Sequence, residues 1–549
     1  MNFQKLLLLV TWATLFLSCS AMPAHSGALN TEAGTTESHP GNSPQTHPEA
    51  FQTATPEELG LKSEPLELIT QAVWRGDYPN VHSVLILKEN YLVYEQYFEG
   101  TDRRWNRESK IDWVSLKFDR NTLHDTRSAG KSITSALVGI AVEAGYIESV
   151  QKSIFDFFPE YAAQLTAAKR EIKIEHLLTM SAGLDWNESD VPYTNPANHE
   201  IQMEDSDDPA GFVLGRPVVA RPGSTFYYNS GLPTLVGYIV SRASGVSFGD
   251  FARAHLFEPL DMQGIEWGGC CNPKSPPEFA WEGEAPWARA AVPGGSLWIR
   301  PIDLLKFGSL FLNQGQWNGK EILSSEWVTR SLAPLVSVSD ADLHYGKDAT
   351  SAVSYGYFWW HYQFKLPYGE LTVHAAQGNG GQRVWVIPSL DLVVVHMTGN
   401  YNIDGAGWRA DRLLLERIVP WAKGIDTDYR HSRGLPAYPV EPASAIRKLE
   451  DPERYVGLWQ QSGREVREVE VTIQDGSLFM IQGEFGGWNL IPEAENVFSF
   501  GVISEGRLTK RFLPDIRIVF IPDEAGSFTR YELRRHGENK ALVVAERLE

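Results

Sequence analysis

Two kinds of hydrophobic periodicity alternate along most of the chain, and their order constrains its fold more than any other feature. Residues 81–98 alternate between apolar and polar side chains, which is typical of two strands joined by a turn. Residues 131–145 carry apolar side chains at helical spacing. Further helices are expected at residues 175–179, 235–242, 248–256, 301–313 and 325–331, and strands return at residues 371–374, 383–387 and 392–397. Strands therefore lie at both ends of this region, with helices between them, as in an α/β domain.

The first 19 residues are predicted to be a signal peptide. Lys5 precedes an almost uninterrupted apolar stretch from Leu6 to Leu17, which is too short to span a bilayer comfortably. Ser18-Cys19 follows and resembles a bacterial lipoprotein signal, which implies that Cys19 is lipidated. The alternative is simple secretion with cleavage near Ala21. We expect an exported, periplasmic or cell-surface protein that meets the membrane only through this N-terminal anchor.

Composition divides the remainder into four parts. Residues 20–55 are rich in Ser, Thr, Pro and Gly and are predicted to be a flexible linker. Residues 56–422 form the α/β region, and the proline-rich residues 423–453 are a second predicted linker. Residues 454–549 show only strand-like alternation and predict a small all-β domain, a barrel or a sandwich. No set of chemically reactive residues stands out in that domain.

Overall composition excludes several classes of function. The chain has 49 basic and 69 acidic residues and a net charge of −20, so a nucleic-acid partner is not expected. Three cysteines among 549 residues exclude a disulfide framework and a multi-cysteine zinc module. The 14 histidines include neither an H-x-H pair nor an H-E-x-x-H motif. We therefore expect no metal site and no cofactor.

The tetrad Ser128-Ala-Gly-Lys131 stands at the start of the helix expected over residues 131–145. A serine hydroxyl needs an adjacent base to act as a nucleophile, and residues three apart share one helix face. Lys131 can therefore reach the hydroxyl of Ser128, and it acts as a base where burial keeps it partly neutral. The tetrad alone is weak evidence, because a long chain contains such a tetrad by chance.

Six further motifs accompany the tetrad along the chain. His124-Asp-Thr-Arg127 precedes it, and the others are His176-Leu-Leu-Thr-Met-Ser-Ala-Gly-Leu184, Pro222-Gly-Ser-Thr-Phe-Tyr-Tyr228-Asn-Ser-Gly231, Gly294-Gly-Ser-Leu297, Arg300-Pro-Ile-Asp-Leu304 and Ala376-Gln-Gly-Asn-Gly-Gly-Gln382. Over residues 56–422 the set resembles the serine hydrolases of the class C β-lactamase and penicillin-binding-protein type, and within them the esterase and 6-aminohexanoate-dimer hydrolase branch. The resemblance implies a β-lactamase-like two-lobed fold, with an antiparallel sheet flanked by helices and a helical lobe. It also places the active site between the two lobes.

The resemblance also implies roles for individual residues. Ser128 matches the acylated nucleophile, Lys131 its partner base, and Tyr228 the tyrosine that moves protons to the leaving group and activates water. The third position of the family's Y-x-N motif is Ser230 in this chain, where the lactamases have Asn. A hydroxyl can still form hydrogen bonds there, but the separate donor and acceptor groups of the asparagine amide are lost. The backbone N–H groups of Ser128 and Asn379 would form the oxyanion hole.

The triplet Ala376-Gln377-Gly378 departs from the family pattern. Lactamases and carboxypeptidases have Lys or His where this chain has Ala376, and that cation helps to hold a substrate carboxylate. Alanine cannot make such a bond, which favours esters or uncharged amides as substrates. Arg383 could replace the missing charge, and this alternative stays open.

Several other residues invite a catalytic reading that the sequence does not favour. Gly245-Val-Ser247-Phe-Gly249 matches G-x-S-x-G, but a helix precedes it, so Gly245 is read as a helix stop and Ser247 as an N-cap. His176 and His374 are read as structural, with a position facing the cleft left open for His374. Cys270-Cys271 could be a vicinal disulfide or two thiols. Core packing is expected for Trp281, Trp287, Trp298, Trp359, Trp360 and Trp385, some of which could line an acyl pocket.

The sequence therefore predicts a serine hydrolase that cleaves a small-molecule ester or amide through an acyl-enzyme on Ser128. The alternative within enzymes is a β-lactamase or a D-Ala-D-Ala peptidase. The alternative from another class is a catalytically silent protein that binds cell-wall material or peptides on the same scaffold.

Overall fold

The computed structural model of the chain describes residues 51–548. It leaves out residues 75, 106–110, 192, 194, 268–276, 280–290, 340–349, 403–405, 426–446, 463–466, 475, 483–485, 505–506 and 513–515. The predicted signal peptide, Cys19 and the pair Cys270-Cys271 therefore lie outside the described residues. The predicted linker 20–55 overlaps the folded part at its end, because the backbone N–H of Leu92 donates to the carbonyl of Gln52.

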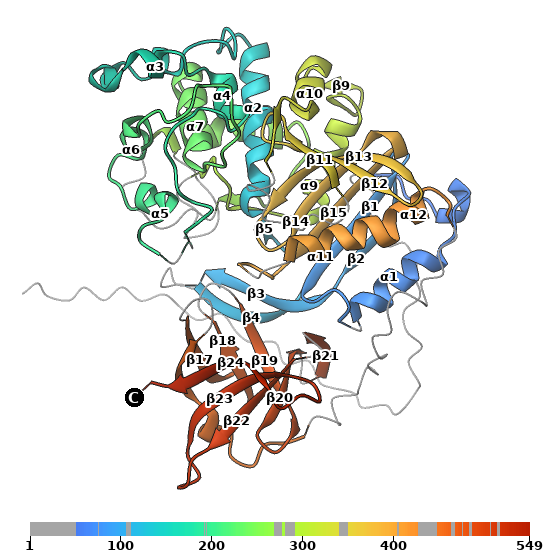
Figure 1. Cartoon of the computed structure of the whole chain (residues 1–549). Helices are drawn as coiled ribbons and strands as arrows, with labels where there is room; N and C mark the ends of the chain where they lie inside the picture. The colour runs from blue at the N-terminus through green and yellow to red at the C-terminus, as the bar shows by residue number, and fades with distance from the viewer. Residues whose placement is uncertain are drawn as a thin grey trace, which may run out of the picture. The chain divides into compact units, whose positions relative to one another are not determined.

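An eight-stranded antiparallel sheet is the centre of the α/β region (Figure 1). Its strand order is β10-β11-β12-β13-β14-β15-β1-β2, so strands from the two ends of the region meet at β15 and β1. The strands are β1 (Val81–Lys88), β2 (Tyr91–Tyr97), β10 (Val336–Ser337), β11 (Thr350–Tyr355), β12 (Trp360–Leu366), β13 (Gly369–Gly378), β14 (Gln382–Ile387) and β15 (Leu392–Thr398).

Helices cover both faces of this sheet, which is why β1, β14 and β15 are buried along their whole length. Gly308 of α9 (Pro301–Leu312) lies against Val384 and Val393 on one face. On the other face, Arg383 of β14 pairs with Asp411 of α11 (Ala406–Leu413), which continues towards α12 (Val419–Ala422). Two more helices belong to this region, α1 (Glu64–Trp74) and α10 (Ser325–Leu332).

A helical lobe lies between β5 (His124–Asp125) and β6 (Glu266–Trp267) in the sequence, built around α2 and α7 (Figure 1). Its helices are α2 (Gly130–Glu143), α3 (Ala167–Arg170), α4 (Ile174–Leu178), α5 (His199–Glu204), α6 (Pro209–Gly215), α7 (Gly231–Ser244) and α8 (Phe248–Ala252). All but the last residues of α2 and α7 are buried, because these two helices pack against each other and against the other elements. α7 ends at Gly245, whose φ of 79° favours glycine.

Three small sheets complete the region. They are β3 (Glu99–Trp105) with β4 (Ile111–Lys117), then β5 (His124–Asp125), β7 (Leu297–Ile299) and β6 (Glu266–Trp267), and β8 (Gln316–Trp317) with β9 (Lys320–Glu321). In the second of these, β5 pairs with β7, and the chain continues from β5 into α2. This short strand therefore fixes where α2 begins.

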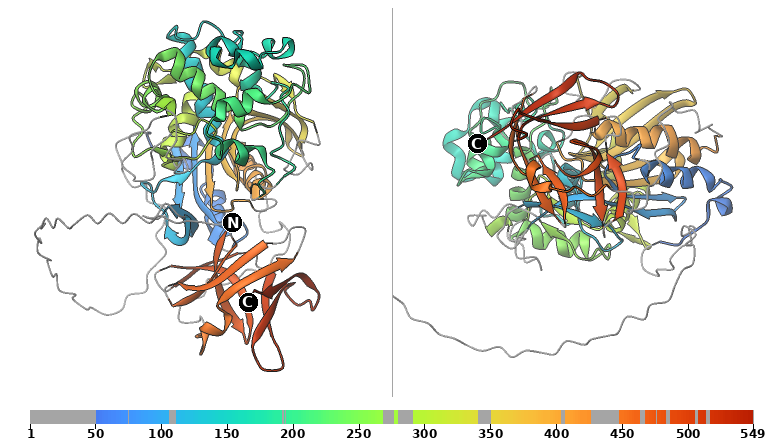
Figure 2. Two further views of the ribbon diagram at one scale, coloured as in Figure 1. Left: turned by 90° about the vertical axis from the view of Figure 1, so that its left-hand side faces the viewer. Right: turned by 90° about the horizontal axis from the view of Figure 1, so that it is seen from below.

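The C-terminal strands form a separate antiparallel barrel (Figure 2). Its order is β19-β18-β17-β16-β24-β23-β22-β20-β21, and an additional pairing of β19 with β20 closes it. The strands are β16 (Gly457–Ser462), β17 (Arg467–Gln474), β18 (Ser477–Ile481), β19 (Gly487–Ala494), β20 (Val497–Ser504), β21 (Arg507–Phe512), β22 (Ile516–Pro522), β23 (Phe528–Arg535) and β24 (Ala541–Arg547). Aromatic and aliphatic side chains fill its core, among them Trp459, Phe520 and Tyr531.

The expected fold class is confirmed: an antiparallel sheet flanked by helices, a helical lobe and a small all-β C-terminal domain. The open choice between barrel and sandwich is settled for the barrel by the β19–β20 pairing. Across the described part of the chain, none of the helices is both long enough and apolar enough to cross a bilayer.

Candidate active site

Ser128 lies in the tight helical turn Arg127–Ala129 that leads from β5 into α2. Its side chain is half-buried, and Lys131, one turn later, is buried. The amine Nζ of Lys131 donates a hydrogen bond to the hydroxyl Oγ of Ser128 over 2.9 Å. The helix therefore brings the expected nucleophile and its partner base into direct contact, as the three-residue spacing requires.

The environment of Lys131 acts on its proton affinity. Burial lowers the pKa of the Lys131 amine below its ordinary value, while the carboxylates of Glu200 and Glu188 act in the opposite direction. The net shift is downward. A lysine whose pKa falls spends a larger share of its time as the neutral amine, which is the form that can accept the proton of Ser128.

Tyr228 reaches the same place from the segment that leads into α7. The Nζ atom of Lys131 lies over its ring, 5.2 Å from the ring centroid. Trp360 of β12 is also a neighbour, stacked on Tyr228 with 6.3 Å between the ring centroids. One further expected site residue, Ser230, is the N-cap of α7. The structure thus brings Tyr228 to Lys131, and a tryptophan of the sheet helps to hold the phenol ring.

A buried carboxylate, Glu188, holds Ser230. The backbone N–H and the hydroxyl of Ser230 donate to its two oxygens over 2.8 and 2.7 Å. The indole of Trp186 and the hydroxyl of Tyr193 add hydrogen bonds of 2.8 and 2.9 Å. A hydroxyl has a single proton, so Ser230, which gives its proton to Glu188, can only accept from any further partner.

A second carboxylate, Glu200, shares this neighbourhood. Burial, followed by the charge of Glu188, raises the pKa of Glu200 well above its ordinary value, although Lys131 opposes the shift. Two acidic side chains, Glu188 and Glu200, thus lie on the side of the site that contains Ser230.

We predict that Glu188→Gln destabilises the protein by about 1–3 kcal/mol in urea unfolding, and that it lowers activity. The amide nitrogen of glutamine cannot accept, so two of the four buried donors lose their acceptor. Glu258 is exposed, and Glu258→Gln is the matched control, expected to unfold like the wild type. Equal unfolding curves for the two variants would contradict the assigned role of Glu188.

The end of β13 lies against the segment that carries Ser128. A Cβ atom on Gly378 would lie 2.2 Å from the carbonyl oxygen of Thr126, closer than any side chain allows. Gly295 approaches the same segment, where a Cβ atom would lie 2.7 Å from the carbonyl oxygen of Arg127. Both positions require glycine because two backbones meet there. The triplet Ala376-Gln377-Gly378 is therefore brought beside the expected nucleophile.

The side chains of this segment are held by their own partners. Gln377 donates to the hydroxyl of Tyr362 over 2.5 Å. The amide of Asn379 donates to Asn402 over 2.7 Å, and its oxygen accepts the backbone N–H of Asn402 over 2.6 Å. This exchange fixes the chain just after β13, where the second backbone N–H of the oxyanion hole is expected.

Arg383 does not stand in for the cation that is missing at Ala376. Ala376 is opposite Val384 in the sheet, and Arg383 is opposite Gln377, so the side chains of Ala376 and Arg383 point to opposite faces. The guanidinium of Arg383 is buried and pairs with Asp411 of α11 over 3.2 Å. The alternative in which Arg383 supplies the charge is therefore wrong.

The residue before Ser128 has an unusual backbone conformation that Asp125 supports. Arg127 has a φ of 51°, which is uncommon outside glycine. Its backbone N–H donates to Asp125 over 2.8 Å, and its guanidinium and that of Arg103 flank the same carboxylate at 3.3 and 2.9 Å. Burial acts to raise the pKa of Asp125, but Arg127 and Arg103 outweigh it and the pKa is lowered. Asp125 is thus a positioning residue for the turn that presents Ser128.

The rival candidates have structural roles. Ser247 is the N-cap of α8 and accepts the backbone N–H of Asp250, as expected. His176 accepts the backbone N–H of Lys173. His374 is buried beside His361, and burial, followed by the charge of His361, lowers its pKa to about 3. Of the tryptophans singled out, Trp360 contacts Tyr228, whereas Trp281 and Trp287 lie outside the described residues.

Sequence reasoning missed Glu188 and Asp125. Glu188 follows an apolar segment with no spacing that relates it to Ser230, and only the fold brings the two together. Asp125 offered one signal, since an aspartate two residues before an arginine can accept that residue's backbone N–H in a turn.

Comparisons with known proteins place the chain in a family. The profile of the Beta-lactamase family matches residues 67–415, which is more than half of the chain. An uncharacterized protein of Alkalihalophilus pseudofirmus is 25% identical over 247 residues, which are 44% of this chain and 62% of that protein. The chain thus matches less than two thirds of this relative's length.

Several solved structures are similar to the chain at low sequence identity. A putative beta-lactamase from Bacteroides dorei is 17% identical, with 66% of this chain and 99% of that chain covered and a TM-score of 0.48. A putative 6-aminohexanoate-dimer hydrolase from Bacillus anthracis is also 17% identical, with 69% and 89% covered and a TM-score of 0.48. An octameric penicillin-binding protein homologue from Pyrococcus abyssi is 17% identical, with 88% and 99% covered and a TM-score of 0.47.

On the extent of the profile match, this chain belongs to the Beta-lactamase family.

Proposed function

We propose that the protein is a serine hydrolase that cleaves esters or uncharged amides through an acyl-enzyme on Ser128. The observation that carries the proposal is the 2.9 Å contact between Ser128 and the buried amine of Lys131, whose pKa is lowered by burial. A buried amine in contact with a half-exposed hydroxyl is the arrangement that general-base activation of a serine requires.

In the acylation step, Lys131 takes the proton of Ser128 as Oγ attacks the substrate carbonyl carbon. The backbone N–H groups of Ser128 and Asn379 stabilise the negative oxygen of the tetrahedral intermediate. The bond to the leaving group then breaks, and the proton passes from Lys131 to that group, with the phenol of Tyr228 as the relay. The products are the acyl-enzyme and an alcohol or amine.

In the deacylation step, water replaces the leaving group. Tyr228 and Lys131 take a proton from the water as its oxygen attacks the acyl carbon, and the ester bond to Ser128 breaks. Oγ of Ser128 regains a proton, so the enzyme returns to its starting state and a carboxylic acid is released. Ser230, with its hydroxyl proton directed at Glu188, is left to accept from Lys131 or from the substrate.

The charges around the site support neutral substrates. Alanine at position 376 offers no cation to a substrate carboxylate, and Arg383 is held by Asp411 on the opposite face of the sheet. The carboxylate of Glu188 adds negative charge on the side of Ser230, which repels a substrate carboxylate further. These features weigh against the β-lactamase and D-Ala-D-Ala peptidase alternative, whose substrates carry a carboxylate.

We predict that the purified protein hydrolyses p-nitrophenyl acetate and butyrate but turns over nitrocefin slowly or not at all. The release of p-nitrophenolate and the colour change of nitrocefin report the two activities in parallel. Fast nitrocefin hydrolysis would favour the β-lactamase alternative. Absence of turnover and of acylation with every acyl donor, read from intact-protein mass, would favour the silent binder.

We further propose that the protein is an exported lipoprotein, anchored in the membrane through Cys19. The mass of the N-terminal peptide from the native bacterial host tests it. A diacylated or triacylated Cys19 supports the anchor, and an N-terminus near residue 22 supports simple secretion instead.

A further inference from the structure

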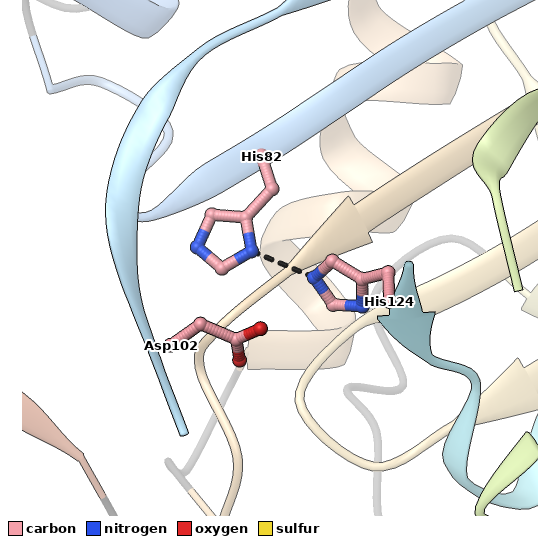
Figure 3. Close-up of side chains that lie close together, drawn as sticks. All are labelled: His82, Asp102 and His124. Atoms are coloured by element: carbon pink, nitrogen blue, oxygen red, sulfur yellow. Dashed lines mark hydrogen bonds between the residues drawn. The ribbon is translucent and has the colours of Figure 1, made fainter. Parts of the chain in front are cut away.

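Three buried side chains from three different strands meet beside the segment that leads to Ser128 (Figure 3). His82 lies on β1, Asp102 on β3 and His124 on β5, and each is at most 1% exposed. One nitrogen of each imidazole and one carboxylate oxygen lie within 4.8 Å of one another. Among the residues that the structure describes, this is the one such group of three.

The hydrogen bonds around His82 fix its tautomer. The backbone N–H of Thr101 donates to Oδ1 of Asn80 over 2.9 Å, and Nδ2 of Asn80 donates to the carbonyl of Thr101 over 2.9 Å. Oδ1 of Asn80 and the carbonyl oxygen of Thr101 are therefore both acceptors, and each lies 3.1 Å from Nε2 of His82. Nε2 must carry the proton, which leaves Nδ1 of the neutral ring with a lone pair.

The tautomer of His124 is fixed by a backbone carbonyl in the same way. Nδ1 of His124 lies 3.2 Å from the backbone carbonyl of Asp125, an acceptor, so this nitrogen also carries its proton. Nε2 of His124 is then the nitrogen with the lone pair. It faces Nδ1 of His82 at 2.7 Å. Two lone pairs at this distance repel each other, so the arrangement calls for a cation between the two rings.

The carboxylate of Asp102 is the third group (Figure 3). Its Oδ1 accepts the hydroxyl of Tyr401 over 3.0 Å, and its Oδ2 lies 3.2 Å from the guanidinium of Arg104 without hydrogen-bond geometry. A carboxylate has about four lone-pair sites, so it can hold these neighbours and still coordinate a cation. The buried negative charge also lowers the cost of placing a cation here.

We propose that His82, Asp102 and His124 form a metal site that takes a divalent transition-metal ion, with zinc as the best fit. Two imidazole nitrogens and a carboxylate oxygen supply three of the four ligands of a tetrahedral zinc site, and a water molecule would take the fourth position. The outer nitrogen of each ring donates to an oxygen, as the second nitrogen of a zinc-bound histidine does. Tetrahedral bonds of about 2.0–2.1 Å separate two nitrogens by about 3.3 Å, so the rings move apart by about 0.6 Å when the ion enters.

The ion would be structural. It would join β1, β3 and β5 at a point four residues before Ser128, where the chain turns towards α2. The sequence alone predicts no metal site, because the three ligands are far apart in it and follow no metal-binding spacing. The inference is independent of the proposed hydrolase activity.

Metal analysis of the full-length protein, together with cobalt substitution, tests the site. We expect one zinc ion per chain after dialysis, a visible d–d spectrum when Co²⁺ replaces it at one equivalent, and a melting temperature that falls by several degrees with a chelator and recovers with Zn²⁺. Asp102→Asn and His124→Gln should lose the spectrum and the response to Zn²⁺. His361→Gln changes a buried histidine pair that belongs to no such group of three, and it should retain both.

Two results would overturn the proposal. The first is wild-type protein that holds no metal, gives no cobalt spectrum and melts unchanged with Zn²⁺, which would mean that the two rings share a proton. The second is a cobalt spectrum that persists in His124→Gln, which would place the ion elsewhere. Because the wild-type measurements need no variant, a variant that fails to fold does not remove the test.

Discussion

Ser128→Ala is expected to abolish covalent labelling by a fluorophosphonate and to remove ester turnover. The substitution removes the hydroxyl oxygen of Ser128, to which Lys131 donates over 2.9 Å, and a methyl group cannot form the acyl bond. Intact-protein mass spectrometry should show one added phosphonyl group on the wild type and none on the variant. The remaining rate with p-nitrophenyl butyrate should fall to the background of the reagent in buffer.

Ser247→Ala is the matched control, because Ser247 stands in the chain's G-x-S-x-G sequence. It is the N-cap of α8, so its loss should cost about 1 kcal/mol of stability and leave labelling intact. Labelling that persists in Ser128→Ala but disappears in Ser247→Ala would move the nucleophile to Ser247 and would refute the proposed mechanism.

Lys131→Met is expected to lower kcat/KM by a factor on the order of 10²–10⁴, the usual contribution of a general base. Methionine has a similar length and shape but accepts no proton from Ser128. In the wild type, kcat/KM should rise with pH, because only the neutral amine is a base and its fraction grows with pH. Since burial lowers the pKa of Lys131, this rise should level off below pH 10.5, the ordinary value for lysine.

The pH profile separates a base from a merely structural lysine. In Lys131→Met the residual activity should lose the rise that belongs to Lys131. Lys169→Met is the control, because Lys169 is also a buried lysine whose pKa is lowered by burial, but it donates to the carbonyl of Leu214. This control should keep the wild-type profile per folded molecule. An unchanged profile in Lys131→Met would show that another group is the base.

Local patterns in the sequence predicted an α/β region followed by a small all-β domain, whereas the two-lobed arrangement was implied by the resemblance of the motifs to a known family. The alternation of residues 81–98 became β1 and β2, and the helical spacing after Ser128 became α2. The strand order could not be predicted from local patterns. β1 lies between β2, its neighbour in sequence, and β15, and only tertiary packing selects β15 as the second partner. The closure of the C-terminal barrel through β19 and β20 likewise depends on tertiary contacts.

The contacts of the candidate site also fall into those that local spacing predicts and those that only the fold brings together. The Ser128–Lys131 contact follows from three residues of spacing on one helix, so the sequence predicted it. The hydrogen bonds of Ser230 to Glu188 join positions 42 residues apart, and the contact between the imidazoles of His82 and His124 also spans 42 residues. Buried polar partners at such separations leave no periodic signature, and only their shared burial in the folded chain reveals them.

The pairing of β1 with β15 has a consequence for how the chain matures. Val84 is matched with His396, about 310 residues later, so β1 lacks one of its two neighbours until nearly three quarters of the chain has been synthesised. Until then an apolar strand has an open edge, which is a hazard for aggregation. Newly made chains should therefore depend on holding chaperones, and truncation anywhere before residue 392 should yield insoluble product rather than a smaller stable protein.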